Sequence, residues 1–278
     1  MTIANGSAPC AAKTIVFVDN DRLILEAMAE LLTAQGYAVH VARDGLEALS
    51  VIRRVKPDYI ILDIVIPKID GGRVCEAVRQ DPLLKNTPII AFSGLSPQDY
   101  RLFPGLSADA YVAKGPLTIA LQNFLKAIGQ LEEPGRETKG GQILGYENFR
   151  SRRLVDELLR ERLHLVAILQ VVAPGALAAD RDGRIVMANP GACEILGKRE
   201  PQLIGEHFAT LFPMPEQEGV QDLVTDLVRS EEPAQCHTEF RLADTVVAAR
   251  LVPIVEDNAC TGLLVILEGK ESTSGEEL

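Results

Sequence analysis

Long apolar runs and a hydrophobic leader are both missing from this chain of 278 residues. No apolar run reaches the ~18 residues that a membrane-spanning helix needs. The N-terminal residues 1–13 lack the basic start and apolar core of a signal peptide. We therefore expect no membrane segment and a cytoplasmic location.

Paired cysteines are also missing. The cysteines are odd in number, widely spaced and without a CxxC pair, at Cys10, Cys75, Cys193, Cys236 and Cys260. This pattern argues against a disulfide framework and against a zinc site built from paired cysteines. We expect free thiols.

A basic excess is missing as well, since the formal net charge is −11. Residues 1–130 hold 13 acidic and 13 basic side chains, whereas residues 131–278 hold 26 acidic and 15 basic ones. Nucleic acid repels an acidic surface and is normally bound by a basic patch. We therefore expect no nucleic-acid partner. The 47% of hydrophobic residues suits a globular protein of one or two domains.

Residues 13–130 alternate between strand and helix patterns. Apolar runs of strand length lie near Thr14, Tyr37, Tyr59, Pro88 and Ala110, and amphipathic segments with helical spacing alternate with them. Such alternation predicts an α/β doubly wound domain, with a five-stranded parallel sheet between two layers of helices. Ligand sites in such sheets lie at the carboxyl ends of the strands.

Polar residues stand at four of these strand ends: Asp19 and Asn20, Asp63, Ser93, and Lys114. Two neighbouring carboxylates repel each other unless a cation lies between them. Mg²⁺ prefers oxygen ligands, and a lysine with a small hydroxyl can hold phosphoryl oxygens. The set predicts phosphoryl transfer to a carboxylate, with Asp63 as the nucleophile.

The region resembles the CheY-like receiver domain of two-component response regulators, which has a flavodoxin-like fold. The matching residues are Asp19, Asp63, Pro67, Gly71, Ser93, Tyr111 and Lys114. The resemblance implies that Asp63 is the phosphoacceptor and that Ser93 and Lys114 contact the phosphoryl oxygens. It also implies a switch formed by Ser93 and Tyr111. The implied Mg²⁺ ligands are Asp19, Asn20, Asp63 and the backbone carbonyl of Val65.

The resemblance has departures. Asn20 replaces the second acid of the family, so we expect weaker Mg²⁺ binding because an amide brings no charge. Lys114 is followed by Gly115 and Pro116, where the family has Lys-Pro directly. Apolar Val65 and Leu95 would flank the phosphoryl group and hinder water, which predicts slow hydrolysis. A degenerate receiver that works without phosphate is the alternative.

The middle of the chain predicts a linker and a helix. Residues 131–149 are polar and glycine-rich, as in a linker. In residues 150–173, apolar side chains fall at heptad spacing with Arg162 interrupting them, which predicts a dimeric coiled coil. The apolar positions are Val155, Leu158, Leu165, Leu169 and Val172. The alternative is a single amphipathic helix that packs on its own domain.

Residues 174–269 resemble a PAS domain, an α+β fold with an antiparallel sheet. The matching features are a hairpin turn at Asp182-Gly183, Asn189 before a short helix, Gly197, Gly205 and three closing strands. PAS domains hold a ligand, haem or flavin in some members and serve only for dimerisation in others, so the ligand stays open. We expect Cys193 to be an ordinary thiol and His207 a capping or surface histidine. Residues 1–12 and 270–278 are predicted to be disordered.

These patterns predict a response regulator. A histidine kinase or phosphotransfer protein would phosphorylate Asp63, and the helix would pass the change to a PAS domain that forms a homodimer or binds a downstream protein. We expect no enzyme activity beyond the protein's own phosphorylation and dephosphorylation. The alternative is a PAS-based small-molecule sensor with a degenerate receiver as a docking scaffold. A degraded histidine kinase is disfavoured, because no ATP-binding segment follows.

Overall fold

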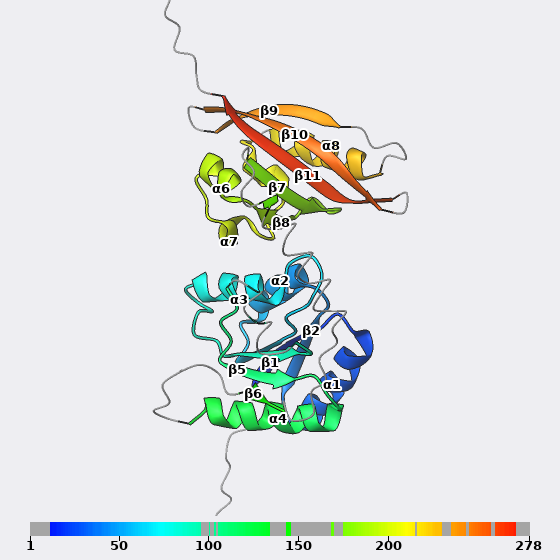
Figure 1. Cartoon of the computed structure of the whole chain (residues 1–278), viewed down its shortest axis with the longest axis vertical. Helices are drawn as coiled ribbons and strands as arrows, with labels where there is room; N and C mark the ends of the chain where they lie inside the picture. The colour runs from blue at the N-terminus through cyan, green and yellow to red at the C-terminus, as the bar shows by residue number, and fades with distance from the viewer. Residues whose placement is uncertain are drawn as a thin grey trace, which may run out of the picture. The chain divides into compact units, whose positions relative to one another are not determined.

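The computed structural model divides the chain into two compact units, Met1–Arg152 and Arg153–Leu278 (Figure 1). It describes residues 12–95, 100, 103, 105–133, 143–145, 168–169, 175–214, 216–229, 235–242, 245–256 and 259–270. Each unit has its own β-sheet.

The first unit contains a parallel sheet with the strand order β2-β1-β3-β4-β5-β6. Its main strands are β1 (Thr14–Val18), β2 (Ala38–Ala42), β3 (Tyr59–Leu62), β4 (Ile89–Ser93) and β5 (Ala110–Ala113). Every residue of β3 and β4 is buried, as expected for strands that are covered on both faces. The prediction of a doubly wound parallel sheet is confirmed.

Among the described residues, four helices cover this sheet (Figure 1). They are α1 (Arg22–Ala34), α2 (Gly45–Val55), α3 (Gly71–Gln80) and α4 (Leu117–Leu131). Helices α1 and α4 pack together, and so do α2 and α3, and the two pairs cover opposite faces of the sheet. The carboxylates of Asp21, Asp44 and Asp70 accept backbone N–H groups at the starts of α1, α2 and α3.

An aromatic cluster fills the face of the sheet under α1 and α4. The rings of Phe17, Phe92 and Phe124 lie with centroids 5.0 to 6.1 Å apart, in tilted or edge-to-face arrangements. All three side chains are fully buried. The cluster joins β1, β4 and α4, so it fixes the strand ends that carry the polar residues discussed below.

The sheet also contains a sixth, very short strand that the sequence did not predict. Strand β6 (Ile143–Leu144) pairs in parallel with Tyr111 and Val112 of β5. It lies in residues 131–149, the predicted linker. Leu144 is buried against the core, and this burial is why two residues of a polar stretch join the sheet.

The second unit contains an antiparallel sheet with the order β8-β7-β11-β10-β9. Its strands are β7 (Gly175–Asp180), β8 (Ile185–Ala188), β9 (Cys236–Leu242), β10 (Thr245–Glu256) and β11 (Ala259–Lys270). The helical elements are α6 (Pro190–Leu196), α7 (Glu200–Leu203), the 3₁₀ helix η3 (Phe208–Leu211) and α8 (Glu216–Arg229). The predicted hairpin and the closing antiparallel meander are confirmed.

Of the predicted joining helix, the structure describes only Ile168 and Leu169, which are helical. The buried Asn189 caps α6 and links it by a hydrogen bond to Leu169. Its Oδ1 accepts hydrogen bonds from the Ala176 and Ala192 amides, both at 2.8 Å, and its Nδ2 donates to the Leu169 carbonyl at 3.1 Å. The heptad positions Val155, Leu158, Arg162, Leu165 and Val172 lie outside the described residues, so the coiled coil stays a prediction.

None of the helices in the described part of the chain combines the length and apolar character that crossing a bilayer requires.

Candidate functional site

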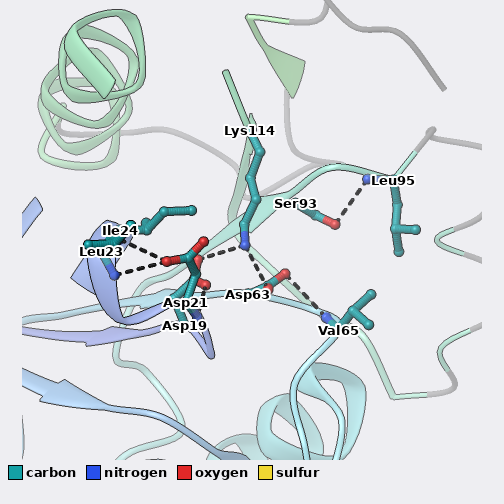
Figure 2. Close-up of polar contacts among 9 residues, drawn as sticks. All are labelled: Asp19, Asp21, Leu23, Ile24, Asp63, Val65, Ser93, Leu95 and Lys114. Carbon is teal, nitrogen blue, oxygen red and sulfur yellow. Dashed lines mark hydrogen bonds and ion pairs between the residues drawn. The ribbon is translucent and has the colours of Figure 1, made fainter. Parts of the chain in front are cut away.

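The carboxyl ends of four parallel strands bring four of the predicted site residues to one edge of the sheet (Figure 2). Asp19 follows β1 and Asp63 follows β3, while Ser93 ends β4 and Lys114 follows β5. The Asp63 amide donates to the Val18 carbonyl, and the Lys114 amide donates to the Ser93 carbonyl, both at 2.9 Å. Backbone pairing between neighbouring strands therefore fixes where each side chain starts.

The loop after Asp63 has almost no free space, and glycine is required in it. The Gly71 amide donates to the Ile64 carbonyl at 2.9 Å. A Cβ atom at Gly71 would lie 2.8 Å from the Asp63 carbonyl oxygen and 2.8 Å from the Ile64 Cα. Lys68 has a φ of 65°, so its backbone adopts the left-handed conformation within this loop. The Pro67 carbonyl accepts a hydrogen bond from the Gly45 amide at 3.2 Å. This packing explains the sequence pattern that follows Asp63.

The Lys114 ammonium joins the two aspartates. Its Nζ lies 2.7 Å from Asp19 Oδ2 and 2.8 Å from Asp63 Oδ2, as Figure 2 shows. It also lies 5.3 Å above the centre of the Phe92 ring, a cation–π contact that the sequence alone did not suggest. One positive charge therefore serves two buried carboxylates, and a net negative charge remains.

Asp19 is fully buried, and one of its carboxylate oxygens can accept a further ligand. Its Oδ1 accepts the Asp21 amide at 2.9 Å. Its Oδ2 forms the ion pair with Lys114 at 2.7 Å, and no other described residue contacts this oxygen by a hydrogen bond or ion pair. A buried carboxylate oxygen with unused lone pairs is the type of ligand that a hard cation binds.

Burial dominates the electrostatics of Asp63. It raises the pKa of Asp63 from 3.8 to about 6; the Lys114 charge lowers this pKa, and the Asp19 charge raises it. The Val65 amide donates to Asp63 Oδ1 at 3.2 Å, which also favours the carboxylate. Above about pH 6, Asp63 is therefore an anion with two defined contacts.

Lys114 is held in its charged form. Burial acts to lower the pKa of Lys114, but the charges of Asp63 and Asp19 outweigh it and raise the pKa above its ordinary value. The ammonium is therefore retained at all pH values near neutrality. It can stabilise negative charge that develops on a group bound to Asp63.

The oxygen atoms at this sheet edge are of the type that Mg²⁺ binds, and the buried carboxylates among them are those of Asp19 and Asp63. The Asn20 side chain is exposed next to Asp19, and an amide oxygen is a neutral ligand. Among the described residues, no group of three or more His, Cys, Asp or Glu side chains could hold a metal. The two buried aspartates, with Asn20 and the Val65 carbonyl, are the residues that would hold Mg²⁺.

The two predicted switch residues lie on neighbouring strands. Ser93 is buried, and its Oγ accepts the Leu95 amide at 3.2 Å. Tyr111 on β5 is half-buried and stacks on Tyr100, with ring centroids 4.8 Å apart. Burial raises the pKa of Tyr111. The structure thus places Tyr111 near the same sheet edge but does not join it to the cluster of Asp19, Asp63 and Lys114.

In the second unit, the surroundings of His207, Cys193 and His237 do not indicate a metal or cofactor site. His207 Nδ1 accepts the Ala209 amide at 3.1 Å and caps η3, as predicted. Burial raises the pKa of Cys193, which disfavours a reactive thiolate. His237 is exposed on β9. A group of arginines also lies near His207, and its members come from two separate segments of the sequence.

Two family models match the chain. The response regulator receiver domain matches residues 15–123, and the PAS fold matches residues 163–266. The response regulator MprA of Mycobacterium leprae (strain TN) is 34% identical over 119 residues, covering 42% of this chain and 50% of the relative. The alkaline phosphatase synthesis transcriptional regulatory protein PhoP of Bacillus subtilis (strain 168) is 34% identical over 137 residues, covering 48% and 56%.

The chain therefore spans about half the length of the curated relatives it matches. Among solved structures, the chemotaxis response regulator CheY4 of Vibrio cholerae matches 42% of this chain and 98% of its own, with 27% identity and a TM-score of 0.40. The family assignments made from the sequence are confirmed. The chain carries a response regulator receiver domain in its first unit and a PAS fold in its second.

Proposed function

We propose that this protein works as a two-component response regulator in which Asp63 accepts a phosphoryl group from a histidine kinase or phosphotransfer protein. The observation that carries the proposal is the Lys114 ammonium placed 2.8 Å from Asp63 Oδ2 and 2.7 Å from Asp19 Oδ2. Burying two carboxylates beside one shared lysine is costly, and a purely structural role for either aspartate would not need that arrangement.

The proposed step is a displacement at phosphorus. A carboxylate oxygen of Asp63 forms a bond to the phosphorus atom while the phosphorus–nitrogen bond of the donor's phosphohistidine breaks. The electron pair of that bond stays on the imidazole nitrogen. Asp63 must be ionised to attack, and its pKa of about 6 leaves it mostly ionised at neutral pH.

Two side chains and a metal ion would stabilise the charge on the transferred group. Lys114 is positioned to pair with a phosphoryl oxygen, and the Ser93 hydroxyl can donate to another, since its oxygen already accepts the Leu95 amide. Asp19, Asn20, Asp63 and the Val65 carbonyl would hold Mg²⁺, which supplies positive charge for the phosphoryl oxygens. We expect no enzyme activity beyond this phosphorylation and its reversal.

The output in this proposal is protein contact. A phosphoryl group on Asp63 would compete for Lys114 and draw Ser93 toward it, which frees space for Tyr111 to leave Tyr100 and move inward. The predicted joining helix would carry the change to the PAS domain, which would form a homodimer or bind a downstream protein. The acidic charge of residues 131–278 disfavours nucleic acid as a partner.

The test is intact mass after incubation with acetyl phosphate and Mg²⁺, on the wild type and on Asp63→Asn. We expect the mass of one phosphoryl group on the wild type and none on the variant. Asp58→Asn serves as a control, because Asp58 is an exposed aspartate that caps the Thr14 amide away from the site. Equal labelling of wild type and Asp63→Asn would overturn the proposal.

A second candidate is a small-molecule sensor in which the receiver only docks a partner. The exposed Asn20 favours it, because the site lacks one of the usual anionic metal ligands. Absence of labelling from both acetyl phosphate and a phosphorylated partner, together with a bound small molecule in the PAS domain, would move this candidate ahead.

A further inference from the structure

A cavity of about 710 Å³ opens on the second unit between the β7–β8 turn, the start of η3 and helix α8. Its lining is mostly polar, and three of the lining side chains are arginines. The lining residues are Arg181, Asp182, Arg184, His207, Gln221, Val224, Thr225, Val228 and Arg229. We call it the arginine cavity.

Backbone pairing holds the turn against the segment before η3. Arg184 and His207 form an isolated antiparallel bridge, the Phe208 amide donates to the Gly183 carbonyl at 2.7 Å, and the Gly205 amide donates to the Ile185 carbonyl at 2.9 Å. Directly paired residues direct their side chains to the same side. Arg184 and His207 therefore face the cavity together.

Gly183 in the turn allows His207 and helix α8 to pack closely against the turn. A Cβ atom at Gly183 would lie 2.6 Å from His207 Nε2 and 3.1 Å from Val224 Cγ1, and the residue has a φ of 73°. The turn, the imidazole and helix α8 therefore meet at one point. From α8, Gln221, Thr225 and Arg229 are spaced by one turn each, so they extend along one face of the helix.

The cavity is a positive site in an acidic unit. Residues 175–270 hold 16 acidic and 8 basic side chains, yet three arginines and only one acid, Asp182, line this cavity. Arg181, Arg184 and Arg229 are exposed, and none of them forms an ion pair with any residue that the structure describes. Three like charges beside a single acid, with no ion pair between them and any described residue, raise the free energy, and a bound anion would relieve that cost.

The positive charge of the cavity affects the pKa of the His207 imidazole. The pKa of His207 is lowered, first because the ring is partly buried and next because of the Arg184 charge. Arg184 itself is held in place, since its Nη1 donates to the Gly205 carbonyl at 3.0 Å. The guanidinium thus has further N–H donors that remain available to a ligand.

We propose that the arginine cavity binds a small organic anion that carries two or more phosphoryl groups. Guanidinium groups match phosphoryl oxygens with paired hydrogen bonds. The volume lies in the range of small-molecule sites, roughly 300–1,000 Å³, and leaves room for an organic part beside Gln221 and Val228. With only two valines among the lining residues, the walls do not suit an apolar cofactor. The proposal does not depend on phosphorylation of Asp63.

Titration calorimetry on the full chain tests it, with ADP, pyrophosphate and adenosine as probes and a chelator present to remove divalent metal. We expect ADP and pyrophosphate to bind, more weakly as salt rises, and adenosine not to bind. The double variant Arg181→Gln/Arg229→Gln should weaken ADP binding by roughly tenfold or more, given what a charge-assisted hydrogen bond contributes. Arg184 stays unchanged because it supports the loop.

The matched control is Lys198→Gln/Arg250→Gln, which removes the same charge from two exposed positions of the same unit that do not line the cavity. It should bind ADP within about twofold of the wild type. Thermal unfolding of each variant checks that it folds. The proposal is overturned if neither phosphorylated probe binds, if the two double variants bind ADP equally, or if adenosine binds as well as ADP.

Discussion

The two units treat their buried polar side chains in opposite ways. In the receiver, the buried carboxylates of Asp19 and Asp63 meet the partly buried Lys114 ammonium at the sheet edge. In the PAS unit, the buried polar groups serve the backbone: Asp180 Oδ1 accepts the Asp182 and Arg184 amides, and Asn189 closes α6. The arginines that line its cavity are exposed instead, and they form no ion pair with any described residue.

This difference indicates where chemistry can occur. A buried carboxylate placed beside other charges is a candidate for reactivity, whereas one that accepts only backbone amides stabilises the fold. Asp63 has its pKa raised to about 6. The expectation is that substitutions in the receiver cluster change electrostatics and pH dependence, whereas Asn189 substitutions change only structure.

The largest expected effect comes from removing the shared cation with Lys114→Met. The two aspartates then stay buried without a partner, which typically costs about 3–5 kcal/mol. Urea unfolding at about pH 7 should show this loss, and the loss should shrink at about pH 5 as Asp63 becomes protonated. Lys126→Met, at an exposed position of α4, is the control and should change stability by less than about 0.5 kcal/mol.

A loss from Lys114→Met no greater than that from Lys126→Met would contradict the idea that Lys114 neutralises both carboxylates. A pH-independent loss would indicate that only side-chain packing had been removed.

Next in size is the pH dependence that Asp63 imposes. Its pKa is higher in the folded protein than the ordinary value of 3.8, so the folded state binds the proton more tightly than the unfolded chain. The ionised form therefore costs stability, an effect that is absent below about pH 4, grows as pH rises and is complete above about pH 6. A difference of about two pKa units corresponds to ~3 kcal/mol.

Asp63→Asn removes that cost. The variant should be more stable than the wild type by up to about 3 kcal/mol at pH 8 and by little at pH 4, measured by urea unfolding. Glu30→Gln, an exposed acid on α1, should show no such trend. A gain that is the same at both pH values would disprove the raised pKa as its source.

In the PAS unit, Asn189→Ala should cost about 2 kcal/mol at every pH. It leaves the buried Ala176 and Ala192 amides without an acceptor and removes the N-cap of α6. Thermal unfolding at about pH 6 and about pH 8 measures it, and equal losses are expected because no proton is involved. A loss that varies with pH would remove the contrast between the units.

Asn189→Asp separates the two functions of this side chain. It keeps an oxygen that accepts both amides but removes the Nδ2–H donor to the Leu169 carbonyl. If this contact ties the joining helix to the PAS fold, hydrogen exchange should speed up around Leu169 in Asn189→Asp while α6 keeps its protection.

The sequence predicted that the polar residues of the receiver lie at one sheet edge, because each of them stands at the end of an apolar run. Strands that are buried on both faces appear in the sequence as continuous apolar stretches. The first polar residue after such a stretch therefore marks the carboxyl end of the strand. The two-residue strand β6 could not be predicted, since its pairing depends on the burial of Leu144 against the core and not on any local pattern. The same limit applies to the link between Asn189 and Leu169.

The arginine cavity was beyond prediction for a related reason. Arg181 and Arg184 lie in a hairpin turn, where exposed charges are common, and Arg229 lies in the last turn of α8, where a basic residue is favourable in any helix. Each has an ordinary local explanation. The pairing of residues 183–185 with residues 205–208, together with the packing of α8 against η3, brings the turn and α8 to one cavity.

The smallest expected effect concerns Asn20. Asn20→Asp supplies the charge that the site lacks, so Mg²⁺ should bind roughly tenfold more tightly, because ligand charge sets the affinity of such sites. The concentration of Mg²⁺ that gives half-maximal phosphorylation from acetyl phosphate measures this, and Mg²⁺ calorimetry without phosphate donor checks it independently. Gln122→Glu adds the same charge at an exposed position of α4 and should leave the Mg²⁺ affinity unchanged. If Asn20→Asp also leaves it unchanged, the exposed side chain at position 20 is no metal ligand, and Asp19 and Asp63 bind the ion without it.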